Sequence, residues 1–478
     1  MKQKKEFIPE VPTSVPVREK LVFEPSDVKA DFSSDIGFPG EPPYTRGTSA
    51  DGYRSKDWVV MHYLHAPEPA SNRPLLTMLI QEGIGVAGIQ PDTSCRAGKD
   101  TGGFGDGILL TSKRDFLAIA GRSNLGSIAL RLDGGAMLPA LSALCLSSGN
   151  LTQLHPLIDP FSDDLLTRCL LSPTARLDLS GKALDHMLKQ GVLGKIVFSA
   201  WRIGEVSFSP ALQLAYAAFN AQLYLRMLEK RGYEIKRLLP IVEFELPVSE
   251  NFPQEVAKFR AARRFLYRTF KSINEDGAPP HLFARGTINE FTEEQQQNNA
   301  VRSTIQCMAA AVGGAEGIAI GEPTARSGEG GWKDVRYAIR AQQIVAHEAN
   351  VGHTTDPAGG SYYIEAKTED YAKQAESIFH SMLEDEPFEA FVNYIAAPLL
   401  ELRERQKTEL EEGTSIRVGV NLFREKGRRS RRGSGPKYIK PQSARNYRPV
   451  DLEPKSMDEM VAFFKRGGTL WDVFDSNR

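Results

Sequence analysis

Short apolar runs alternate with longer amphipathic stretches along the chain from Arg73 onward. The short runs are rich in β-branched residues and predict strands, whereas apolar residues in the longer stretches recur at helical spacing. The predicted strands are residues 86–89, 128–132, 195–199, 239–246, 281–285 and 317–320. The clearest predicted helices are residues 211–230, 254–271, 299–312 and 332–349.

Helix-like sequence follows each predicted strand, which gives at least six strand–helix units. Parallel strands joined by helices build either a closed barrel or an open sheet. This number of units in one uninterrupted body favours a (β/α)8 TIM barrel of the α/β class, with an open doubly wound sheet as the second choice. The uncharged stretch 134–158 contains two prolines and several polar residues, so we expect a buried helix and its loop there, not a membrane span.

The two ends of the chain differ from this pattern. Residues 1–47 mix seven prolines with charged residues and predict an extended N-terminal arm, lying on the protein's own body or on a partner. Residues 48–422 form the predicted barrel. Residues 423–478 predict a basic linker and C-terminal tail, in which six of the nine residues 424–432 are Lys or Arg. A last short helix is expected at 457–465, packed as a cap.

Charge and composition exclude several classes of function. Lys and Arg number 59 against 60 Asp and Glu, so no basic excess favours nucleic acid or an anionic membrane as a partner. The four cysteines are far apart and no paired-histidine zinc motif occurs, so we expect no metal site. The charged, proline-rich N-terminus lacks the apolar core of a signal peptide, which predicts a cytoplasmic protein.

Barrel enzymes carry their chemistry at the carboxyl ends of the strands. Glu243 and Glu245 are two residues apart, hence on one face of a strand, and a carboxylate pair suits glycoside hydrolysis. For such close neighbours the sequence favours a solvated edge or salt-bridged carboxylates over a catalytic pair. Trp201 and Arg202 follow another strand, where the arginine either binds a carboxylate or phosphate or stacks on the indole.

Several motifs together resemble the methylmalonyl-CoA mutase family. They are Asn298 to Gly314, Gln343-Ile344, His347-Glu348 and Asp356 to Glu365, with supporting stretches at 43–47, 259–263 and 412–421. The resemblance spans roughly Tyr44 to Asn421. It implies a (β/α)8 barrel whose bore admits an acyl-CoA thioester. It also implies a capping domain with adenosylcobalamin, which makes the radical for a carbon-skeleton rearrangement.

The resemblance also suggests roles for single residues. Tyr63 matches a tyrosine that wedges against the substrate, and Trp201 and Arg202 stand where catalytic members have a Tyr-His pair. Gln343 matches a substrate-side glutamine and Glu205 a glutamate near the corrin face. The candidate residues are therefore catalytic Tyr63, Trp201 and Arg202, substrate-binding Lys56, His281 and Gln343, and cofactor-binding Glu205.

Departures from the family pattern bear on activity. Lys56, Val59 and Met61 replace residues that bind CoA, and Gly314 and Glu316 replace a histidine and a glutamine. The region between Asp159 and Phe198 is shorter than in catalytic members. The motif Asp-x-His-x-x-Gly, whose histidine ligates cobalt in the family, is absent from the sequence, so adenosylcobalamin is expected on a partner chain.

Two family arrangements fit this pattern, and both predict a hetero-oligomer. In the first, which the departures favour, the chain is a catalytically silent small subunit that stabilises a cobalamin-binding catalytic subunit. In the second, it is a catalytic large subunit for a different acyl-CoA, with Arg202 in place of the histidine and cobalamin on a separate chain.

Overall fold

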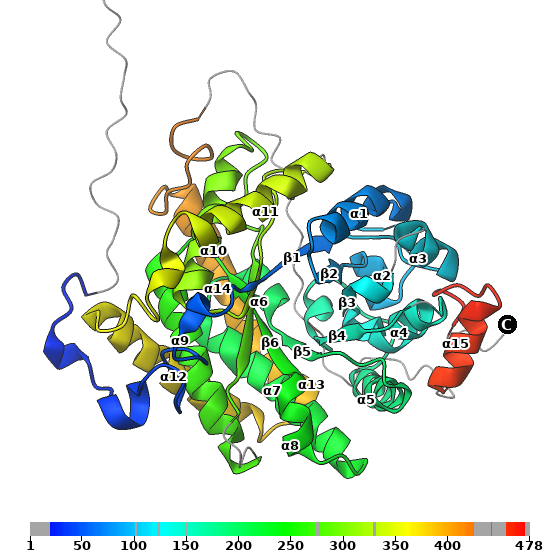
Figure 1. The fold of residues 1–478 in the computed structure, drawn as a ribbon, viewed down its shortest axis with the longest axis horizontal. Helices are drawn as coiled ribbons and strands as arrows, with labels where there is room; N and C mark the ends of the chain where they lie inside the picture. Colours follow the sequence, from blue (N-terminus) through cyan, green and yellow to red (C-terminus); the bar gives the residue numbers. More distant parts are fainter. Residues whose placement is uncertain are drawn as a thin grey trace, which may run out of the picture.

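The computed structural model describes residues 20–100, 103–121, 125–149, 151–273, 278–327, 331–424, 441 and 456–473. Residues 1–19 of the predicted arm, and all of the predicted basic run except Arg424, lie outside this part of the chain. Within it, eight parallel strands close into a barrel in the order β1 to β8, with helices around them (Figure 1). The predicted (β/α)8 barrel is confirmed, and the open sheet is wrong.

The elements follow the alternation of the sequence. The strands are β1 Val59–Leu64, β2 Val86–Ile89, β3 Ala129–Asp133, β4 Leu154–Ile158, β5 Ile196–Ser199, β6 Val242–Val248, β7 His281–Gly286 and β8 Gly317–Ala319. The first helices are α1 Arg73–Gln81, α2 Thr93–Ala97, α3 Lys113–Ala120, α4 Leu138–Leu146, α5 Pro173–Gln190, α6 Trp201–Val206, α7 Pro210–Lys230 and α8 Ile235–Leu238. The later helices are α9 Phe252–Phe270, α10 Asn298–Val312, α11 Trp332–His347, α12 Tyr362–Met382, α13 Pro387–Ala390, α14 Ala397–Glu411 and α15 Met457–Lys465.

The core lies between the strands and the surrounding helices. Successive strand residues face alternately outward to the helices and inward to the bore. Phe198 of β5 and Phe244 of β6 face outward and pack into the main hydrophobic cluster, together with Phe259 of α9. Because the inward residues are covered as well, strands such as β3, β4 and β5 are buried along their whole length.

Local signals set the ends of the helices. In α5 the Ser172 hydroxyl accepts from the Ala175 N–H, and Pro173 occupies the first turn, where its missing N–H costs nothing. Gly191 ends this helix at φ 66°, a left-handed conformation that glycine adopts without strain. The predicted helices 211–230, 254–271, 299–312 and 332–349 are confirmed to within two residues at each end.

Two strands were not predicted. The stretch 134–158 does contain a buried helix, α4, but its last residues form β4 where a loop was expected. Pro156 lies inside β4 and lacks a backbone N–H, which normally argues against an interior strand. The other missed strand, β1, precedes Arg73, where the regular alternation of the sequence begins.

The described parts of both ends pack on the barrel's own helices. In residues 20–47, Asp35 pairs with Arg268 of α9, and the ring of Phe23 contacts Tyr363 of α12. The predicted last helix is confirmed as α15, which lies against α4 and α5 (Figure 1). Among the described residues, no helix has both the length and the apolar character needed to cross a membrane.

Candidate functional site

Charged side chains fill the middle of the bore. Arg131 of β3 reaches across to β6, where it pairs with Glu243 and lies 3.2 Å from a carboxylate oxygen of Glu245. Glu245 is fully buried and also accepts hydrogen bonds from the hydroxyls of Tyr63 and Ser199, the latter at 3.0 Å. Residues from β1, β3, β5 and β6 therefore meet at one carboxylate.

Arg285 of β7 continues this arrangement toward the carboxyl ends of the strands. Its guanidinium lies 3.5 Å from carboxylate oxygens of both Glu245 and Asp133. The guanidinium carbon also lies 3.5 Å from the ring centroid of Tyr63 and 3.5 Å from that of Trp201. A cation between two aromatic faces is attracted to both. The rings of Tyr63 and Trp201 therefore hold the guanidinium of Arg285 between them.

Arg202 extends the same chain of charges beyond the strands. Its guanidinium lies 3.1 Å from Asp133 and 3.4 Å from Asp163. Arg96 in turn lies 3.2 Å from Asp163 and 3.4 Å from Asp106. Four arginines and five carboxylates therefore alternate through the barrel, and we call this set the ion ladder: Glu243, Arg131, Glu245, Arg285, Asp133, Arg202, Asp163, Arg96 and Asp106.

Neighbouring arginines favour the charged forms of two carboxyls of the ion ladder, Asp133 and Asp106. Burial opposes ionisation of Asp133, but Arg202, Arg96 and Arg285 more than offset it and lower the pKa of that carboxyl. The same balance of burial against Arg96 and Arg202 lowers the pKa of Asp106 to about 2. A buried charge without its partner costs several kcal/mol, so each member constrains its neighbours.

A cavity of about 470 Å³ lies at the amino-terminal end of the barrel. The first residues of four strands line it, and its inner end is formed by Arg131, Glu243 and Phe283. Among the described residues, none of the ladder members beyond this point, from Glu245 onward, lines the cavity. The cavity therefore stops at the ion ladder and does not continue to the other end of the bore.

The structure separates the seven predicted site residues. Tyr63, Trp201 and Arg202 come together at the ion ladder, whereas Lys56 and His281 line the cavity at the opposite end. Glu205 of α6 is half-buried and accepts from the Ile288 N–H at 2.8 Å. Gln343 of α11 accepts a hydrogen bond from Arg340, whose guanidinium pairs with Glu82 just after α1, away from the bore. Their functional roles stay predictions.

Glu205 has an unusual titration. Burial raises its pKa from 4.5 to about 7, although the Ile288 N–H and the charges of Arg285 and Arg202 act in the opposite direction. The carboxyl is therefore partly protonated near neutral pH.

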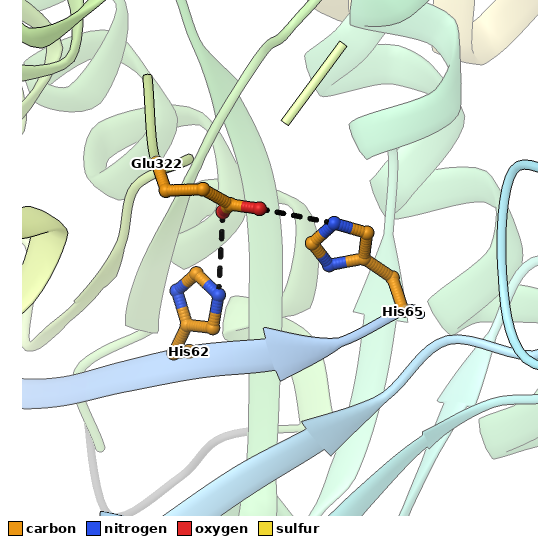
Figure 2. Close-up of side chains that lie close together, drawn as sticks. All are labelled: His62, His65 and Glu322. Carbon is orange, nitrogen blue, oxygen red and sulfur yellow. Dashed lines mark ion pairs between the residues drawn. The ribbon is translucent and has the colours of Figure 1, made fainter. Parts of the chain in front are cut away.

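A second cluster at the carboxyl end of the barrel was missed by sequence reasoning. His62 of β1, His65 just after β1 and Glu322 just after β8 converge, as Figure 2 shows. Burial lowers the pKa of His62 to about 4. Despite its own burial, the pKa of His65 is raised to about 9 by Glu322. The spacing His62-x-x-His65 is visible in the sequence, but its carboxylate partner lies about 260 residues away.

Comparison with known proteins identifies the barrel. A family model described as methylmalonyl-CoA mutase matches residues 13–106 and 178–451, which is more than half of the chain. The chain belongs to the methylmalonyl-CoA mutase family. The match skips residues 107–177, a part of the barrel that includes β3, β4 and the ladder members Arg131, Asp133 and Asp163.

Curated relatives agree with this assignment. A protein named 2-hydroxyisobutanoyl-CoA mutase large subunit, from Aquincola tertiaricarbonis, is 25% identical over 73% of this chain and 66% of its own length. Proteins named methylmalonyl-CoA mutase are 25% identical in Cereibacter sphaeroides, over 81% of this chain and 58% of theirs, and 24% identical in Escherichia coli, over 85% and 60%. The chain thus spans about three fifths of the length of these relatives.

The carboxylates considered for glycoside hydrolysis are salt-bridged, which is one of the two interpretations that the sequence left open. Glu243 and Glu245 both bind Arg131. An acid and a nucleophile in a glycosidase must instead face the substrate, and Glu245 is fully buried under four partners. The geometry gives no support to hydrolysis.

Removing Arg131 should destabilise the protein strongly. Arg131→Met leaves Glu243 and Glu245 without their shared cation, and we expect the free energy of unfolding to fall by about 3–5 kcal/mol. Urea unfolding followed by circular dichroism measures the change. The control is Lys182→Met on α5, which removes an exposed pair with Asp178 and should cost less than about 1 kcal/mol. Equal effects of the two variants would contradict a structural role for the ion ladder.

Glu205 should make stability depend on pH. Its pKa is higher in the folded than in the unfolded protein, so its contribution is fully present below pH 4.5 and is lost as pH rises through 7. Glu205→Gln has no such loss. Relative to the native protein, we therefore expect the free energy of unfolding of the variant to rise by about 2–3 kcal/mol between pH 4.5 and 8. Unfolding curves at closely spaced pH values test this, and parallel pH profiles would disprove it.

Proposed function

We propose that this chain is the catalytically silent barrel of a cobalamin-dependent acyl-CoA mutase complex, kept because it stabilises a catalytic partner. The observation that carries the proposal is the ion ladder, which fills the bore that the family is expected to use for the acyl-CoA thioester. The proposal includes adenosylcobalamin on the partner chain and a cytoplasmic complex.

The residues at the ladder do not fit a reacting substrate. Tyr63 is 6% exposed, and its hydroxyl donates to Glu245 while its ring faces Arg285. Arg202 is held by Asp133 and Asp163, so a thioester carbonyl would have to compete with two carboxylates for it. For an acyl-CoA to pass, Arg131 and its partners would have to separate while still buried, at a cost of several kcal/mol. We therefore assign no step of the rearrangement to this chain.

Exposed apolar side chains support a protein partner. Tyr337 and Ile344 are 65% and 48% exposed, and they are two helical turns apart on one face of α11. Val301 of the neighbouring α10 is 61% exposed. Large exposed apolar side chains on two packed helices suit a surface that a partner covers.

One observation favours the alternative, a catalytic large subunit for a different acyl-CoA. The relative from Aquincola tertiaricarbonis is named a large subunit, and the alignment covers 73% of this chain. In that case Arg202 must leave its two aspartates to bind the substrate, and cobalamin comes from a separate small chain.

Purification of the tagged chain from its native source, with mass spectrometry of co-purifying proteins, tests the proposal. We expect a mutase chain that carries its own cobalamin-binding domain, and we expect its thermal half-life to shorten when this chain is removed. The double variant Tyr337→Glu/Ile344→Glu should lose the partner, since it places charges on the apolar face of α11. Lys182→Glu, on the exposed side of α5, is the control and should retain it.

Two results would contradict the silent-subunit proposal. One is equal turnover and thermal stability of the partner with and without this chain. The other is a short cobalamin-domain chain as the sole mutase partner, with turnover that Arg202→Ala abolishes while the fold is kept. The second result would establish the catalytic alternative.

A further inference from the structure

None of His62, His65 and Glu322 is a member of the ion ladder or lines the cavity. Met61 and Tyr63 face the bore, so His62 between them points out of it. The Nε2 atom of His62 lies 3.4 Å from Oε2 of Glu322, and Nε2 of His65 lies 3.1 Å from Oε1 (Figure 2). Each side chain offers one possible metal-ligand atom, and these three atoms all lie within 4.8 Å of one another.

Two of these atoms lack a hydrogen-bond partner. His62 is 3% and Glu322 is 4% exposed, and neither Nε2 of His62 nor Oε2 of Glu322 makes a hydrogen bond within the described residues. Buried polar atoms are nearly always paired, because an unpaired one costs about 1–3 kcal/mol. An imidazole nitrogen and a carboxylate oxygen left unpaired next to each other would both be satisfied by one cation.

The surroundings orient the second histidine. Nδ1 of His65 lies 3.1 Å from the backbone oxygen of Tyr63, which can only accept a hydrogen bond. Nδ1 therefore carries the proton of that bond, and Nε2 is the atom directed at Glu322. Histidines that bind metals typically donate their other N–H to a carbonyl or carboxylate in this way.

The distances also suit a metal ion. Ligand atoms about 2.1 Å from a shared ion lie about 3.0 Å apart at right angles and about 3.4 Å apart at the tetrahedral angle. The nitrogen–oxygen distances of 3.1 and 3.4 Å, each to a different oxygen of Glu322, lie within this range. The side chain of His65 is 24% exposed, which leaves one side of the cluster open to solvent.

We propose that His62, His65 and Glu322 bind one divalent first-row transition-metal ion, such as Zn²⁺, Mn²⁺ or Fe²⁺. Two imidazole nitrogens and a carboxylate are ligands these ions share, and three protein ligands leave positions open for water or another small molecule. The site is independent of the mutase chemistry and of the proposed silent-subunit function.

Metal titration of the full chain tests this site. After treatment with a chelator, the protein is titrated with Zn²⁺ by calorimetry and with Co²⁺ by visible absorption. We expect one equivalent to bind, with ligand-field bands for Co²⁺ and a raised melting temperature with Zn²⁺. His65→Ala and Glu322→Gln should each weaken metal binding by about 100-fold or more. Loss of a residue that only supports a metal ligand already weakens binding by up to about 100-fold, and these two residues are the ligands themselves. The exposed histidine variant His353→Ala is the matched control and should bind normally.

Opposite results would overturn the proposal. No saturable binding at one equivalent, or equal affinity in the triad variants and His353→Ala, would mean that His65 and Glu322 form an ion pair only. If the variants fail to fold, a measurement on the native protein still tests the proposed metal site. Proton NMR of the Co²⁺ form should show shifted ring N–H signals from two histidines, and their absence would exclude the site.

Discussion

The pairing of buried charges along the axis joins strands on opposite sides of the barrel. The ion pairs within the bore join distant strands: Arg131 on β3 meets Glu245 on β6, and Arg285 on β7 meets Asp133 on β3. Such pairs exist only when the sheet is closed, so an opened barrel would leave several buried ions without partners. The ion ladder thus links closure of the fold to a filled bore, and the same side chains cannot also line an open channel.

This constraint explains how a barrel of the mutase family can keep the family's architecture although charged side chains fill its bore. Helices and outward-facing strand residues form the core, which does not involve the bore. The bore is therefore free to change, and here it holds charged and aromatic side chains where the family is expected to admit a thioester. Trp201, predicted from the resemblance to stand with Arg202 in place of a Tyr-His pair, packs on Arg285 of the ion ladder, and Arg202 is itself a member of it.

The sequence predicted most of the fold and only part of the site. The barrel, six strands and the long helices followed from apolar spacing, but β4 was missed because Pro156 argues against a strand, and β1 because it precedes the regular pattern. Spacing showed that Glu243 and Glu245 share a face. It could not show that Arg131, 112 residues earlier, is their partner, since that contact is created only by closure of the barrel. The link between His62 and Glu322 was hidden in the same way.

A crystal structure of the protein soaked with methylmalonyl-CoA tests the central claim most directly. If the ion ladder closes the bore, Arg131, Glu245 and Arg285 stay paired, and any bound CoA lies at the amino-terminal cavity. A pantetheine chain running through the bore to Tyr63 and Arg202, with these pairs broken, would contradict the account.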